Sequence, residues 1–325
     1  MTTKALLVAA GVFSVAAFAV AAPLLTYSLS LAIFGLPHVL TELRYVDERF
    51  GARISPRLGY TFLAILLLIV GLRLFSMADL GLVEAPRIEL ILVLGLAAVT
   101  LPILKNSPRS LTVGLMVLVA ISCGLLVSPI STLVLLAVAH NLTPIGFLVE
   151  QCGAKRRRAV LAVCGLVFGL IPILIATGLP WQALNWVGWT SANASILGVG
   201  TLSDQLGVFV PPMWRESNLA VHLFAAAAYL QCVHYAVVIH VLPRLSDGAT
   251  TTAIPWPRAR VFTGVVFGAG LVFFLGFAQS FTETRSVYGI FAAVHAWIEV
   301  PILLLALELR PRDHATSFGD SQHAA

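Results

Sequence analysis

The chain has 325 residues, of which 59% are hydrophobic and only 11% charged, and its formal net charge is +5. Soluble domains carry about 25% charged residues, so this composition excludes an ordinary water-soluble protein and indicates that lipid is the main solvent. Most basic residues stand in short loops between apolar runs, which is typical of topology determinants and not of a nucleic-acid-binding surface.

Ten apolar segments approach the roughly 20 residues of helix that cross a bilayer. In chain order they are 5–22, 24–43, 58–78, 88–104, 110–127, 131–150, 159–178, 218–243, 261–281 and 287–309. They predict an all-α fold: a polytopic transmembrane helix bundle of about nine or ten helices, forming one unit over residues 1–309.

The N-terminal segments leave one question open. The alanine-rich run that ends at Ala22 imitates a signal peptide, but the apolar residues after Pro23 predict a retained membrane helix. Segments 5–22 and 24–43 have almost no loop between them. They therefore form either one long helix kinked at Pro23 or a tight hairpin that turns there.

The loops alternate in positive charge. Lys and Arg gather at 44–57, 105–109, 155–158, 244–260 and 310–312, whereas the loops at 79–87, 128–130, 179–216 and 282–286 are poor in them. By the positive-inside rule, this alternation predicts a cytoplasmic C-terminus. The long loop 179–216 carries four tryptophans and suits an amphipathic segment on the outer surface, and the polar tail 310–325 is typical of a disordered end. We expect a multi-pass cell-membrane protein, of the inner membrane in a bacterium.

Histidines are the most unusual residues of the apolar segments, because ionisable groups inside a membrane are costly and point to function. Six of the eight histidines lie there: His38, His140, His222, His234, His240 and His295. Counted at about 1.5 Å per residue, most of them share a layer between the midplane and the cytoplasmic side. His222 joins only if this layer is tilted, and His240 suits a snorkelling position at the boundary.

Two segments carry the same motif. His38 precedes Glu42 by four residues, and His295 precedes Glu299 by four residues. Each pair therefore lies on one helical face, one turn apart. Imidazole and carboxylate together suit iron, zinc or manganese rather than copper(I). The alternative is that each glutamate only orients its own histidine, or that Glu42 lies at the aqueous interface.

The two motifs and the other buried histidines predict one metal site. Its candidate ligands, for one or two ions, are His38, Glu42, His140, His222, His234, His295 and Glu299. A ligating histidine usually donates its second N–H to a polar neighbour, and the candidates for such support are Asn141, Gln231 and Tyr235. Pro144 frees the carbonyl of His140, which indicates irregular backbone beside a cavity.

A metal inside a lipid-embedded bundle suggests a lipophilic substrate. Non-haem iron with dioxygen supplies the chemistry that hydrocarbons require. The sequence therefore favours an integral membrane oxygenase that acts on a carotenoid, another isoprenoid or a lipid, with an electron donor as a further partner where the reaction needs one. The residues assign no individual catalytic group and no nucleic-acid partner.

A short motif supports this class. Gly35-Leu36-Pro37-His38 resembles an element near the N-terminus of the Brp/Blh family of membrane β-carotene dioxygenases, and the stretch 229–244 is similar to their later paired-histidine helix. The resemblance implies a multi-helix fold, a non-haem iron and cleavage of β-carotene into retinal. It also implies that His38 and His234 are ligands. The family continues its motif with small residues and an aspartate, where this chain has Val39 to Glu42, and this departure leaves the substrate open.

Other functions fit the same histidines. A b-type haem protein or haem-modifying enzyme would use pairs among His140, His222, His234 and His295 as axial ligands. A proton-coupled transporter would use buried His and Glu residues as a relay or a cation site. A buried zinc could instead support hydrolysis, and an assembly factor would use polar residues only to hold helices together.

Overall fold

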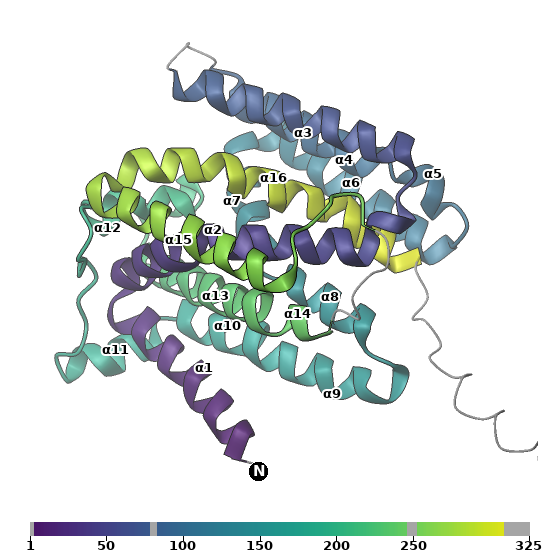
Figure 1. Cartoon of the computed structure of the whole chain (residues 1–325). Helices are drawn as coiled ribbons and strands as arrows, with labels where there is room; N and C mark the ends of the chain where they lie inside the picture. Colours follow the sequence, from purple (N-terminus) through teal and green to yellow (C-terminus); the bar gives the residue numbers. More distant parts are fainter. Residues whose placement is uncertain (1–2, 79–82, 246–251, 309–325) are drawn as a thin grey trace, which may run out of the picture.

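The computed structural model describes residues 3–78, 83–245 and 252–308. Within these ranges every regular element is a helix and no strand occurs, so the predicted all-α class is confirmed. The long helices run through a single bundle (Figure 1). Helices suit an apolar chain because they satisfy all their backbone N–H and C=O groups internally.

Nine helical segments of the described chain are long and apolar enough to cross a membrane, which indicates a multi-pass membrane protein and confirms the predicted helix count. They are α2 (Pro23–Phe50) with η1 (Gly51–Arg53), α3 (Pro56–Met77), α4 (Ala85–Ala98) with α5 (Leu101–Leu104), α6 (Pro108–Val127), α7 (Pro129–His140) with α8 (Thr143–Gln151), α9 (Ala154–Cys164) with the π-helical η2 (Gly165–Leu170) and α10 (Ile171–Ala176), α13 (Ala220–His240) with α14 (Leu242–Leu245), α15 (Ala259–Gln279) and α16 (Phe281–Glu308). A shorter apolar helix, α1 (Thr3–Ala21), precedes them.

Serine–proline pairs begin three of these helices. Ser55, Ser107 and Ser128 each stand directly before a proline, and each side chain accepts a hydrogen bond from a backbone N–H three residues further on. The serine satisfies one of the N–H groups left free at a helix start, and the proline has no N–H to satisfy. The spans α3, α6 and α7 therefore begin where the sequence punctuates the apolar pattern.

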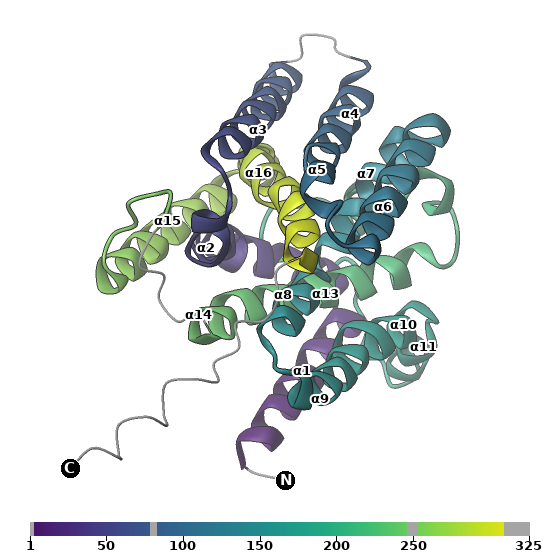
Figure 2. The ribbon, with the colours of Figure 1, turned by 90° about the vertical axis from the view of Figure 1, so that its right-hand side faces the viewer.

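Residues 5–43 form two helices. Ala22 has φ −143° and ψ 70°, which interrupts the helix between α1 and α2. Helix α1 then packs against α13, while α2 crosses the centre of the bundle (Figures 1 and 2). The turn near Pro23 is thus the second of the two arrangements that the sequence allowed.

The two ends of the bundle differ in charge. Element η1, helix α5, the start of α9 and the last turn of α16 lie together on the right in Figure 1, and the basic loops adjoin them. We call this the basic end. The segment 177–219 lies at the other end, on the left, which we call the loop end. This arrangement follows the charge alternation of the sequence.

The segment 177–219 is more folded than a surface loop. It contains α11 (Leu179–Trp186), α12 (Leu202–Gln205), η3 (Leu206–Val208) and η4 (Pro212–Trp214). Trp186 and Trp189 are exposed, as an interfacial segment requires. Leu202, Phe209 and Val210, however, are buried against α2 and α13. Part of this loop therefore closes the loop end of the bundle instead of lying on the membrane surface. The predicted tail 310–325 lies outside the described residues.

Three helices form the centre of the bundle. In the most apolar stretch of α13, 67% of the residues are buried, against 50% in α2 and α16 and 17% in α6 and α15. A run of alanines, Ala225 to Ala228, lets neighbouring helices approach α13 closely. Lipid therefore covers the outer helices, and side chains at the centre meet only protein or a cavity.

Candidate metal centre

The central helices and one outer span bring most of the predicted ligands to one point. Helix α2 carries His38 and Glu42, the end of α7 carries His140, α13 carries His234, and α16 carries His295. One ligand atom from each of these five residues lies within 4.8 Å of all the others. Glu299, one turn after His295, is buried beside them. We call these six residues the His/Glu cluster.

The two matching motifs hold their histidines in the same way. The Nδ1 atom of His38 lies 3.2 Å from the carbonyl oxygen of Phe34, and that of His295 lies 3.1 Å from the carbonyl oxygen of Phe291. A carbonyl oxygen only accepts hydrogen bonds, so Nδ1 carries the proton in both rings. The Nε2 atom of each neutral imidazole is therefore unprotonated, and its lone pair is available to a metal ion.

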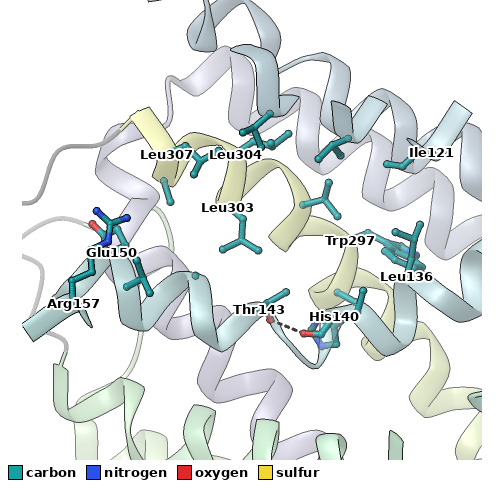
Figure 3. A pocket seen from close by; sticks show the side chains of 18 residues that line it. Ile121, Leu136, His140, Thr143, Glu150, Arg157, Trp297, Leu303, Leu304 and Leu307 are labelled. Atoms are coloured by element: carbon teal, nitrogen blue, oxygen red, sulfur yellow. Dashed lines mark hydrogen bonds between the residues drawn. The ribbon is translucent and has the colours of Figure 1, made fainter. Parts of the chain in front are cut away.

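No hydrogen bond of acceptable geometry fixes the tautomer of His140. Its Nδ1 atom lies 2.7 Å from Oε2 of Glu299, although the angles are poor for a hydrogen bond. The helix breaks at this histidine, because Pro144 leaves the His140 carbonyl without its usual partner. The Thr143 hydroxyl donates to that carbonyl instead at 2.8 Å (Figure 3). The predicted irregular backbone is thus present, and it turns the His140 ring toward the cluster.

Three imidazole Nε2 atoms lie close together in the cluster. The Nε2 atom of His295 lies 3.1 Å from Nε2 of His38 and 3.0 Å from Nε2 of His140. The Nε2 atoms of His38 and His295 are both unprotonated and cannot hydrogen-bond to each other, so a shared cation would account for their short separation. Nitrogens about 2.1 Å from one ion and at right angles to each other would lie about 3.0 Å apart. The two observed spacings fit neighbouring positions of an octahedral site, with His295 next to both His38 and His140.

Glu42 and His234 complete the ring of ligands. Oε2 of Glu42 lies 3.3 Å from Nε2 of His234, and both side chains are fully enclosed. Neither carboxylate oxygen of Glu42, and neither ring nitrogen of His234, has a hydrogen-bond partner of acceptable geometry. Buried polar atoms without partners are costly. A ligated cation would satisfy them.

The charge of the cluster also favours a cation. The carboxyl groups of Glu42 and Glu299 adjoin each other in the interior. Four neutral imidazoles cannot offset the negative charge that this pair of carboxyl groups carries when it is ionised, and an uncompensated buried charge is strongly destabilising. A bound cation would offset that charge. Ligands on opposite sides of one ion lie about 4.2 Å apart, so the 4.8 Å spread of the five atoms fits one ion after slight contraction, or two ions.

One predicted ligand lies elsewhere. His222 is at the loop end of α13, where its ring faces Trp181 and Gly178. The prediction that it joins the layer is therefore wrong for this fold. Twelve residues separate it from His234, which is about 18 Å along a helix axis, and no tilt of α13 brings both rings to the same point.

The three supporting residues bond in other directions. The Asn141 amide donates to the carbonyls of Ala137 and Val138, where it caps the broken helix. The Gln231 amide donates to Ser30 and to the Tyr27 carbonyl. Neither amide bonds to a cluster histidine, and the prediction for them is corrected accordingly. Tyr235 does adjoin the cluster: its ring stacks on His38, with centroids 4.0 Å apart.

Two cavities reach the cluster. The first has a volume of about 630 Å³ and an apolar wall between α6, α8 and α16. Figure 3 shows His140 and Trp297 at one end of it and Glu150 with Arg157 at the other, toward the basic end. We call it the apolar cavity.

The second cavity has a volume of about 620 Å³ and runs from His38, His140 and His295 toward the loop end. It is lined by more polar groups, among them Arg73 and Arg285, and we call it the polar cavity. Neither arginine is among the site residues predicted from the sequence. The signal that could have found Arg73 is a charged residue inside an apolar run, with Glu89 as a second such residue. Arg73 and Glu89 lie 2.6 Å apart.

These features define a multi-pass, all-α membrane protein with a buried His/Glu cluster that could hold a metal ion. Comparisons with models of protein families, with curated proteins and with solved structures give no match for this chain. The resemblance to the Brp/Blh carotene dioxygenases stays a prediction from its short motif.

Proposed function

We propose that this protein is an integral membrane oxygenase that uses a non-haem metal, most suitably iron, on a lipophilic substrate. The single observation that carries the proposal is the His/Glu cluster, which an apolar cavity reaches at His140, inside a bundle whose outer surface suits lipid. A hydrocarbon chain can reach such a site from the membrane without crossing water.

The donor set suits the metal. Imidazole nitrogens with a carboxylate are the ligands of non-haem iron in oxygenases, where one face of the octahedron is left open. His295 would occupy a position next to both His38 and His140, and Glu42 with His234 stands beside them. Bound iron would supply the redox chemistry with dioxygen that an unactivated hydrocarbon needs.

The surrounding residues have distinct roles. Glu299 Oε2 lies 2.7 Å from Nδ1 of His140, and with a small rotation it would accept that N–H and leave Nε2 free for the ion. A carboxylate behind a ligating histidine fixes its tautomer and raises its basicity. Trp297 and Leu136 in the wall of the apolar cavity exclude water and would contact the substrate chain. The cavity volume lies within the range of about 300–1,000 Å³ typical of small-molecule sites.

The alternatives fit the cluster less well. Two axial imidazoles of a haem bind the iron from opposite faces of the porphyrin, with nitrogens about 4 Å apart. Nitrogens 3.0 and 3.1 Å apart leave no room for the macrocycle. A transporter would need hydrated paths on both sides of the cluster, and leucine and valine line the path toward the basic end.

The test is an oxygen-dependent product. Membranes that contain the protein are incubated with β-carotene under air and under argon, and the products are separated by chromatography. The proposal expects an oxidised product, such as retinal, under air only, and none from the His295→Ala protein. A panel of other isoprenoids and fatty acids extends the search for the substrate. An equal product from His295→Ala would contradict the role of the cluster.

A further inference from the structure

The polar cavity has a cation at its mouth and the His/Glu cluster at its floor. Arg285, Tyr288, Ala292 and His295 all line it, and all four belong to α16. Their spacing of three or four residues places them on one face of the helix. A molecule in this cavity therefore lies along α16, with Arg285 near one end and His295 near the other.

Arg285 lacks a counter-ion. Among the described residues, no carboxylate oxygen lies within 4.0 Å of its guanidinium group, and its hydrogen bond goes to the neutral side-chain oxygen of Gln205. Arg73, at the same end of the cavity, is by contrast paired with Glu89. A guanidinium group has five N–H donors, so donors of Arg285 remain for an anion.

The guanidinium group is held in place by a built loop. Gln205 is buried, and its amide donates to the Val199 carbonyl at 2.7 Å. Gln205 ends the short helix α12, which begins with a capping box in which Thr201 and Asp204 bond to each other. These bonds hold the pKa of Asp204 below its usual value. Arg285 is therefore fixed toward the cavity by a neutral partner that leaves its charge in place.

The walls between the two ends are mostly uncharged. Leu31, Leu133, Ala292 and Ala293 line the cavity beside the rings of Tyr235 and Tyr288. The two tyrosine hydroxyls lie 3.3 Å apart and bond to each other, so their polar atoms are satisfied. This interior suits an alkyl or isoprenoid chain rather than a sugar or a nucleotide.

The geometry of α16 also gives the length of the alkyl chain that would fit the polar cavity. Ten residues separate Arg285 from His295, which is about 15 Å along the helix axis. An extended chain advances about 1.2 Å per covalent bond, as in the polypeptide backbone. A chain of about twelve bonds therefore spans the distance from the arginine to the cluster.

We propose that the polar cavity binds an amphiphile with an anionic head group, a carboxylate, on Arg285 and its chain directed at His295. The geometry of a guanidinium group suits a carboxylate, which can accept two parallel hydrogen bonds. This inference rests on the proposed function for the chemistry at the cluster, and it adds a long-chain acid, bound in the polar cavity, to the lipophilic molecules that could reach the cluster.

The test is ligand binding by the full chain in nanodiscs, followed by tryptophan fluorescence, with hexadecanoate and its methyl ester as probes. Arg285→Gln is expected to weaken the binding of hexadecanoate at least about tenfold and to leave the ester unchanged, whereas Arg285→Lys keeps most of the affinity. The matched control is Arg87→Gln, which removes an exposed arginine paired with Glu84. Equal losses for acid and ester, or no loss for the acid, would overturn the proposal.

A substitution at Ala292 tests the direction in which the alkyl chain of the bound acid lies. Ala292→Phe places a ring about 10 Å from Arg285. It should weaken hexadecanoate binding at least about fivefold and spare hexanoate, whose chain is too short to reach the ring. Equal effects on both acids would contradict the proposed direction.

A further binding experiment distinguishes a failure of the head-group site from a failure of the proposed oxygenase function. The binding experiment is repeated with the His295→Ala protein, which should bind hexadecanoate as before even when its metal is lost. If the protein binds the acid selectively but holds no metal, the proposed oxygenase function is wrong and the head-group site on Arg285 stands. If it holds a metal but does not prefer the acid to the ester, the head-group site is wrong and the proposed function stands.

Discussion

At the scale of single residues, proton positions determine the chemistry of the cluster. The Phe34 and Phe291 carbonyls accept hydrogen bonds from Nδ1 of His38 and His295, and Glu299 lies 2.7 Å from Nδ1 of His140. The Nε2 atom of His295 then lies close to Nε2 of both other rings. None of these contacts is a metal bond, yet together they prepare the ligands before an ion arrives, which reduces the cost of ordering them.

Glu299→Gln tests this preparation. The amide keeps the size of the side chain but loses the charge that holds the His140 proton. The metal dissociation constant should rise about 10- to 100-fold, as for other supporting carboxylates, measured by competition with a chelator. Glu283→Gln, an exposed change on the same helix, serves as the control. An unchanged affinity in Glu299→Gln would show that Glu299 has no such role.

At the scale of helices, close packing positions the ligands. A Cβ atom on Gly270 of α15 would lie 2.8 Å from Cγ of Pro37, the residue before His38. The proline ring cannot move aside as a flexible side chain could. The glycine therefore allows α15 to press on α2 at the point where α2 delivers its histidine.

Gly270→Ala should accordingly destabilise the protein by about 1–3 kcal/mol, the usual range for overpacking, and should lower its metal content. Thermal unfolding in detergent measures the first effect and elemental analysis the second. Gly268→Ala is the matched control, because a Cβ atom there meets nothing within 4 Å. If both variants behave alike, α15 does not support His38 in this way.

Residue spacing within a helix could be predicted from the sequence, whereas the packing of one helix against another could not. The spacing of four residues in His38 and Glu42 places both on one face of a helix, and this holds wherever the helix packs. Depth along a helix is also countable, but rotation about its axis against distant neighbours is not. For that reason the hydrogen bond from Arg285 to Gln205, 80 residues away, has no sequence signal. The prediction for His222 fails for another reason, because the twelve residues between it and His234 place it at a different depth.

At the scale of the whole molecule, the bundle has a basic end and a loop end, with one cavity directed toward each and the cluster between them. The charge alternation predicts that the basic end is cytoplasmic. The alternation was readable because it depends on loop composition alone. The cavities were not, because they form between helices that are distant in the chain.

Cysteine labelling tests this orientation. In a chain whose four native cysteines are replaced by serine, Trp186→Cys should react with a membrane-impermeant maleimide in intact cells. Arg260→Cys, in an exposed position at the basic end, should react only after the cells are opened. Labelling with the reverse pattern would invert the topology.

The central claim is that the His/Glu cluster binds a metal ion. Its most direct test is elemental analysis of the detergent-purified protein, with the His38→Ala/His295→Ala double variant beside it and His240→Ala, an exposed histidine on α13, as the control. We expect one or two equivalents of iron, or of zinc or manganese in its place, in the wild type and the control, and almost none in the double variant. Less than about half an equivalent in the wild type, or full occupancy in the double variant, would contradict it.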